Sequence, residues 1–147
     1  MARLILALVL AAAAVGVAAL VQRRQRPAPP VRTGHAVPDQ LRREDFARPD
    51  APWLVVVFSS ATCDSCAGVW DRARHLESDA VATQEVEVVA DRELHRRYGI
   101  EAVPTTVVVD ARGVVRASFL GPVTATDLWA AVAEVREPGS TPGSCAS

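Results

Sequence analysis

The chain has 147 residues and a formal net charge of −1; half of its residues are hydrophobic and 22% are charged. It contains no lysine and no asparagine, which excludes catalysis by lysine and is typical of a GC-rich bacterial genome. Residues 49–147 carry eight arginines against fourteen acids, and this acidic balance disfavours nucleic acid as a partner.

The amino-terminal segment predicts a membrane anchor. Residues 4–21, which begin with Leu4 and end with Val21, are an uninterrupted run of 18 apolar or small residues. As a helix this run would span roughly 27 Å, close to the hydrocarbon thickness of a bilayer. A cleaved signal peptide is the alternative, but its apolar part is usually about 7 to 15 residues long. We therefore expect residues 1–22 to be a transmembrane helix with the lipid bilayer as its partner.

Residues 23–50 predict a linker rich in arginine and proline. Pro27, Pro29, Pro30 and Pro38 disfavour regular structure. Residues 22–48 hold seven arginines, whereas Arg3 is the only arginine before the apolar run. The positive-inside rule then favours a single-pass protein of the cell membrane whose folded domain faces the cytoplasm.

A C-x-x-C motif follows a predicted buried strand at residues 53–58 and begins a predicted helix that extends to about residue 77. A thiolate attacks disulfides, and the amino end of a helix favours a thiolate. Cys63 would be the nucleophile, and Cys66, one turn further on, would release the partner. Asp64 and Ser65 between them would tune the thiol pKa, with the Asp64 charge opposing a neighbouring thiolate.

Three other interpretations of the motif are half a zinc site, a haem attachment site and two structural thiols. Haem attachment needs a histidine after the second cysteine, where this chain has Ala67. Zinc needs two further ligands, and the only additional cysteine and histidines are scattered along the chain: Cys145, His35, His75 and His95. The strand that precedes the motif favours redox chemistry with no metal and no cofactor beyond a Cys63–Cys66 disulfide.

The remaining elements predict an α/β domain. We expect strands at residues 85–88, 105–109 and 114–119, the last two as a hairpin, and a short helix at 91–97. A final helix at 124–136 would be capped by Thr124 or Thr126. Its buried residues would be Leu128, Trp129, Val132 and Val135. Residues 138–147 would form a flexible tail in which Cys145 is a bystander or a third redox thiol.

From about residue 41 to 137 the chain resembles the thioredoxin family. The resemblance rests on Phe58, Cys63, Cys66, Tyr98-Gly99-Ile100, Val103-Pro104-Thr105 and Gly121. It implies a central mixed four-stranded sheet flanked by helices in residues 51–137, with first elements from near 41. It also implies a cis bond before Pro104, and a substrate groove shaped by Val103, Pro104, Thr105 and Thr62.

The chain departs from the family at several supporting positions. Thr62 stands where a tryptophan is usual, Val57 replaces a buried aspartate, and Glu85 lies near the position of its partner lysine. Proton transfer to or from Cys66 must therefore run through water or another group, or be slow.

The expected function is a membrane-tethered thiol-disulfide oxidoreductase that acts on protein substrates with an unidentified electron donor or acceptor. Two alternatives stay open. One is a redox-silent binding module. The other is an extracytoplasmic reductant or oxidant for exported or cytochrome proteins, since membrane-tethered relatives often work there.

Overall fold

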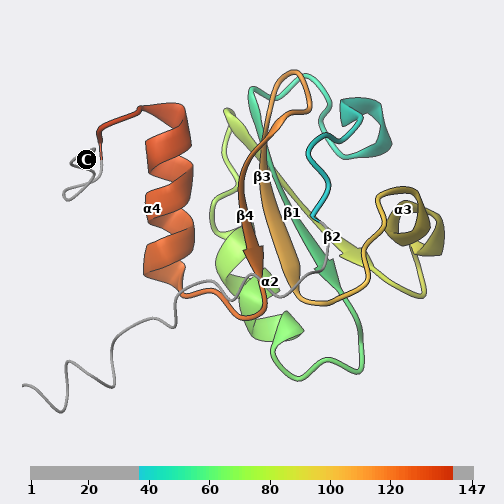
Figure 1. Cartoon of the computed structure of the whole chain (residues 1–147). Helices are drawn as coiled ribbons and strands as arrows, with labels where there is room; N and C mark the ends of the chain where they lie inside the picture. The colour runs from blue at the N-terminus through green and yellow to red at the C-terminus, as the bar shows by residue number, and fades with distance from the viewer. Residues whose placement is uncertain (1–36, 141–147) are drawn as a thin grey trace, which may run out of the picture. The chain divides into compact units, whose positions relative to one another are not determined.

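A mixed four-stranded sheet is the centre of the computed structural model, which describes residues 37–140 (Figure 1). The strands are β1 (Trp53–Ser59), β2 (Val81–Glu87), β3 (Thr105–Asp110) and β4 (Val115–Leu120). Their order is β2-β1-β3-β4, with β1 parallel to β2 and the other neighbours antiparallel. The mixed sheet expected from the sequence is confirmed.

The β1 strand is buried on both of its faces. Leu54, Val56 and Phe58 point into one hydrophobic cluster, whereas Val55 and Val57 point into another. Successive side chains of a strand alternate between the faces of a sheet, so a strand covered on both sides needs an unbroken apolar run. This requirement explains the sequence of residues 53–58.

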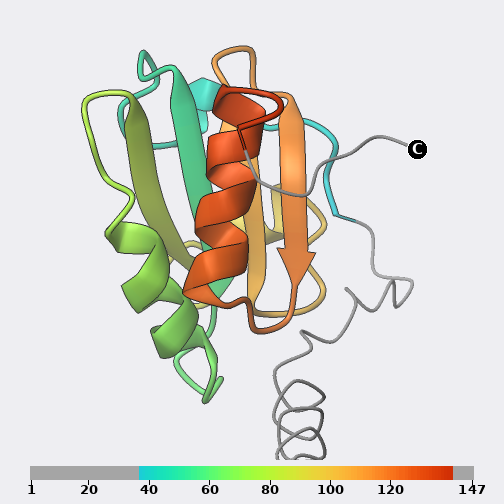
Figure 2. The same ribbon diagram turned by 90° about the vertical axis from the view of Figure 1, so that its left-hand side faces the viewer.

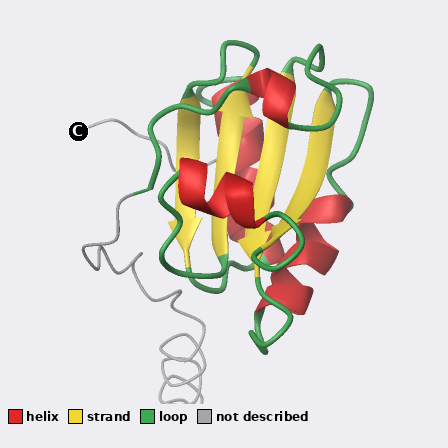
Figure 3. Ribbon diagram, turned by 90° about the vertical axis from the view of Figure 1, so that its right-hand side faces the viewer, coloured by secondary structure: helices red, strands yellow, loops and turns green. Residues whose placement is uncertain are grey.

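Helices cover the two faces in pairs. The helices α2 (Cys66–Arg74) and α4 (Ala125–Arg136) lie over the Val55 and Val57 face (Figure 2). The short helix α3 (Arg92–Arg97) and the 3-10 turn η1 (Arg43–Asp45) lie over the opposite face (Figure 3). The described domain therefore has three layers, with helices on both faces of one sheet.

The α4 helix corrects one sequence prediction. Thr124 is its cap, since its hydroxyl accepts a hydrogen bond from the Asp127 N–H at 3.1 Å. Leu128 and Val132 are buried as expected, but Trp129 is 48% exposed, so its predicted burial is wrong. Each helical residue turns by about 100°, which carries Trp129 away from the face that Leu128 presents to the sheet.

Two predicted boundaries also shift. The α2 helix ends at Arg74, before the expected residue 77, and Glu77 instead accepts hydrogen bonds from the N–H and hydroxyl of Thr83. The β2 strand begins at Val81, four residues before the expected start. Residues 81–84 are part of the strand because they pair in register with residues 53–56 of β1.

Residues 37–50 belong to the folded domain, so the predicted linker does not extend to residue 50, and the buried core begins near residue 41, where the first elements of the domain were expected. Leu41 and Phe46 are 1% and 5% exposed in the cluster under α3. The buried Arg43 guanidinium donates hydrogen bonds to the Asp110 and Arg48 carbonyls, both at 3.1 Å. Because the segment contains only one 3-10 turn, no helical or strand period marked its two buried side chains in advance.

Gly113 lies where this segment crosses the β3–β4 turn. Its φ is +84°, and an added Cβ would collide with the Leu41 carbonyl oxygen, while the Leu41 N–H donates to the Gly113 carbonyl at 2.8 Å. We expect Gly113→Ala to cost about 1–3 kcal/mol more than Gly121→Ala. Gly121 has a similar φ of +89° with open space around it, so Gly121→Ala costs only the strain of a left-handed backbone at a residue with a Cβ. Equal urea midpoints of the two variants would contradict this expectation.

Within residues 37–140 no helix is long and apolar enough to cross a membrane. The predicted anchor at residues 1–22 lies outside the described residues, as do the linker up to residue 36 and residues 141–147 of the predicted tail with Cys145.

Candidate active site

Cys63 and Cys66 form a disulfide with 5.4 Å between their Cα atoms. Cys63 is half-buried in the turn that precedes α2, whereas Cys66 is the first residue of α2 and is 2% exposed. The Cys66 N–H donates to the Cys63 carbonyl at 3.2 Å, which closes the turn. The two sulfurs therefore differ in access, and an incoming molecule can reach Cys63 more easily than Cys66.

Three loops meet at the end of the sheet that carries this disulfide. The register pairs Ser59 at the end of β1 with Glu87 at the end of β2. It also pairs Phe58 with Thr105 at the start of β3. The loop 60–65 with Cys63, the loop 88–91 after β2 and the loop 102–104 before β3 consequently lie at the same end of the sheet. Residues far apart in the sequence are thus gathered around the C-x-x-C motif.

The loop before β3 carries the predicted substrate-binding residues. The Val103–Pro104 peptide bond is cis. Val103 is half-buried, and Pro104 and Thr105 are buried. The Thr105 hydroxyl donates to the Ala102 carbonyl at 2.8 Å, so this side chain stabilises the loop. Of the three predicted residues Val103, Pro104 and Thr105, Val103 is the one whose side chain leaves surface for a partner.

The residues around Cys63 offer polar groups. Thr62 is exposed, and its hydroxyl lies 3.0 Å from the Ser60 hydroxyl. The Ser65 hydroxyl lies 3.7 Å from Cys63 Sγ, whereas Asp64 is exposed. Of the two predicted tuning residues, Ser65 is therefore the one whose side chain lies close to the Cys63 sulfur.

Glu87 is a site residue that the sequence analysis missed. Its carboxylate accepts hydrogen bonds from the N–H groups of Ala61 (3.1 Å), Val89 (2.8 Å) and Ala90 (3.0 Å). It thereby ties the loop before Cys63 to the loop after β2. A glutamate at the end of an alternating strand usually faces solvent, so no sequence signal distinguishes this one. We call these three hydrogen bonds of the Glu87 carboxylate the Glu87 clamp. The clamp also holds Val89, which is 70% exposed, beside the loop that carries Cys63.

The clamp should weaken in acid. Hydrogen bonds from the N–H groups of Ala90, Ala61 and Val89 hold the pKa of Glu87 below its usual value. A depressed pKa means that the clamp is intact above the ordinary carboxyl pKa of about 4.3 and is lost as the pH falls through the lower folded value. We expect amide exchange protection of Ala61 to fall in that range.

The variant Glu87→Gln, with one carboxamide oxygen as acceptor, should show part of this loss at neutral pH. Glu93→Gln is the matched control, because Glu93 bonds to arginine side chains of its own helix. Unchanged Ala61 protection in Glu87→Gln would refute the clamp.

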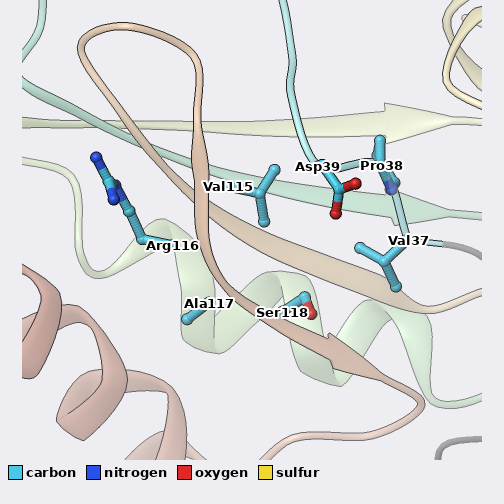
Figure 4. A pocket seen from close by; sticks show the side chains of 7 residues that line it. All are labelled: Val37, Pro38, Asp39, Val115, Arg116, Ala117 and Ser118. Atoms are coloured by element: carbon cyan, nitrogen blue, oxygen red, sulfur yellow. The ribbon is translucent and has the colours of Figure 1, made fainter.

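A shallow pocket of about 140 Å³ lies elsewhere, between residues 37–39 and residues 115–118 of β4 (Figure 4). None of the C-x-x-C or Val103–Pro104 residues lines it. In the part of the chain that the structure describes, no three His, Cys, Asp or Glu side chains gather as a metal site would require.

Comparisons with known proteins agree with this arrangement. No family model matches the chain. A curated protein described as a probable thioredoxin, from Methanothermobacter thermautotrophicus, is 31% identical over 86 residues, which cover 56% of this chain and 95% of that protein.

Solved structures share the fold. A mutant thioredoxin from Halobacterium salinarum matches with a TM-score of 0.51 and 22% identity, over 65% of this chain and 89% of that one. A thioredoxin-fold protein from Helicobacter pylori matches with a TM-score of 0.51 and 16% identity, over 63% and 78% of the two chains. With its mixed sheet, its Cys63–Cys66 disulfide and a curated relative matched over almost its whole length, the chain belongs to the thioredoxin-like family.

Proposed function

We propose that the chain is a thiol-disulfide oxidoreductase that exchanges disulfides with protein substrates through Cys63 and Cys66. The observation that carries the proposal is a Cys63–Cys66 disulfide at the end of the sheet where the loops 60–65, 88–91 and 102–104 meet, with Cys63 half-buried and Cys66 buried. The similarity to a probable thioredoxin supports the same chemistry.

The exchange has two steps. The Cys63 thiolate attacks a substrate disulfide, forms a mixed disulfide and expels one substrate sulfur as a thiolate. The Cys66 thiolate then attacks Cys63 Sγ, so that the Cys63–Cys66 bond forms and the second substrate sulfur leaves. The substrate gains two electrons, the protein dithiol loses two, and an electron donor must reduce the protein again. The reverse sequence oxidises a substrate dithiol.

The first test is the reduction potential of the Cys63–Cys66 pair, measured by thiol alkylation after equilibration in dithiothreitol or glutathione buffers. A potential near −270 mV would support a reductase, and one near −120 mV would support an oxidant, by analogy with about those values in known proteins. Failure to form the disulfide reversibly would favour a redox-silent binding module.

We also propose that residues 4–21 tether the domain to the cell membrane, with the domain on the cytoplasmic side. The apolar run and the arginines that follow it support this arrangement. Alkaline carbonate should leave the full chain in the membrane fraction. In intact cells a membrane-impermeant maleimide should leave the reduced thiols unlabelled. Labelling without lysis would place the domain outside and favour a role with exported or cytochrome proteins.

A further inference from the structure

The second step of the proposed exchange requires Cys66 to lose a proton in a place that water hardly reaches. Only the thiolate attacks, and Cys66 is 2% exposed. The proton acceptor must therefore come from the protein or from a water held by it. We infer that Glu85, held by Ser59, is that acceptor. The inference rests on the proposed function and names a residue for one of its steps.

The sheet register puts Glu85 and Ser59 on the face that α2 covers. Val57 packs on that face with Val69 of α2, and Ser59 is two residues further along the same strand. Glu85 is the register partner of Val57 on the parallel strand β2. Residues paired in this way point to the same side of a sheet. The Ser59 hydroxyl donates to Glu85 Oε1 at 2.8 Å, which agrees with this placement.

Cys66 belongs to the same region. It precedes Val69 by three residues, so it lies on the helix face that packs against the sheet. The chain needs only six residues to pass from Ser59 at the end of β1 to Cys66 at the start of α2. The buried start of α2 therefore follows closely on the buried end of β1, where Ser59 is 1% exposed and bonded to Glu85.

A third polar group on this face lacks a partner. Thr106 is the register partner of Val57 on β3, and its buried Oγ1 has no hydrogen bond when Cys66 is in the disulfide. A buried hydroxyl without a partner is costly. A Cys66 thiolate would offer this hydroxyl an acceptor that a disulfide sulfur scarcely provides. An unpaired Thr106 hydroxyl in the oxidised state is what we expect of a site that stabilises the Cys66 thiolate only while the thiolate exists.

The proton then moves within this group. The Cys66 thiol gives its proton to the Glu85 carboxylate, directly or through the Ser59 hydroxyl, which passes on its own proton. The resulting thiolate attacks Cys63 Sγ, and the protonated Glu85 returns its proton to the departing substrate thiolate or to water. No further oxidant or reductant is needed.

Other charged groups near this face are already engaged or lie further along it. Glu77 is bonded to Thr83, Glu87 to three backbone N–H groups, and the Arg72 guanidinium folds back over Gly68 within α2. Asp64 precedes the helix and is exposed. Glu85 is thus the carboxylate on this face that is hydrogen-bonded to a buried hydroxyl. That hydroxyl belongs to Ser59, the last residue of β1, which six residues separate from the start of α2.

The test separates the two steps in time. The full chain with Cys145→Ser is reduced and mixed with excess 5,5′-dithiobis(2-nitrobenzoate). Attack by Cys63 releases one coloured thiolate at a rate that rises with reagent concentration, and resolution by Cys66 releases a second at a rate that does not. We expect Glu85→Gln to slow the second phase about 100-fold at pH 7 and to leave the first unchanged.

The pH dependence of the second-phase rate distinguishes the loss of a proton acceptor from a change in packing. The defect should shrink as the pH rises past about 8.5, where an ordinary thiol ionises without help. Glu85→Asp should restore part of the rate, Ser59→Ala should show a smaller defect, and Glu77→Gln, which changes a carboxylate further along the face, should match the parent.

An unchanged second phase in Glu85→Gln, or a defect that is constant with pH, would overturn the role of Glu85 while leaving the proposed function intact. A parent protein that releases no second thiolate would overturn the proposed function itself, and the inference with it.

Discussion

Cys66→Ser is expected to turn the protein into a covalent trap, whereas Cys63→Ser should reduce disulfide exchange to the uncatalysed background. Without Cys66 the mixed disulfide on Cys63 has no internal thiolate to break it, so it accumulates. Without Cys63 the remaining Cys66 is 2% exposed and cannot meet a protein substrate. Dithiothreitol-sensitive adducts on non-reducing gels measure the trap, and reduction of a disulfide-bonded test protein measures the exchange.

Cys145 provides the matched control for this pair of variants. Cys145→Ser should retain exchange and form no trapped adducts, since the proposed chemistry needs only Cys63 and Cys66. Adducts that form in Cys63→Ser and disappear when Cys145→Ser is added to that variant would show that the wrong cysteine had been assigned as the nucleophile. Partner capture that persists without any cysteine would favour the binding module.

Removal of residues 1–50 is expected to abolish cooperative folding, whereas removal of residues 1–36 should preserve it. The shorter chain loses the side chains of Leu41 and Phe46, and truncation of such buried residues costs about 2–5 kcal/mol each. It also loses the buried Arg43 and the Asp45 carboxylate, which accepts hydrogen bonds from Tyr98 and Arg97. Domains of this size are stable by only about 5–15 kcal/mol.

Urea unfolding followed by circular dichroism measures this difference. Leu41→Ala in the chain that begins at Val37 is the intermediate control, and we expect it to cost about 2–5 kcal/mol while the transition stays cooperative. Equal midpoints for the chains that begin at Val37 and at Ala51 would mean that residues 37–50 are dispensable, as a linker would be.

The sequence by itself determined the α/β class, the four strands and the two cysteines. The signals were local: a six-residue apolar run at 53–58, a three-residue cysteine spacing, and a Gly113 turn between two short apolar segments. Each depends on neighbours in the chain, and so it can be recognised before any tertiary contact is known. The exposed position of Trp129 was not determined in this way, because an apolar residue beside a buried stripe can face either the core or the solvent.

The tertiary structure decided which side chains meet. Leu41 and Phe46 are buried because residues 37–46 cross the sheet face beside α3. Glu87 becomes a clamp because the ends of β1 and β2 coincide, and Glu85 meets Ser59 because two parallel strands align in register. Such contacts join residues 26 positions apart, and their register depends on how the whole core packs. A local pattern in the sequence does not encode that packing, which is why the cysteines could be found from the sequence and the contacts of Glu85 and Glu87 could not.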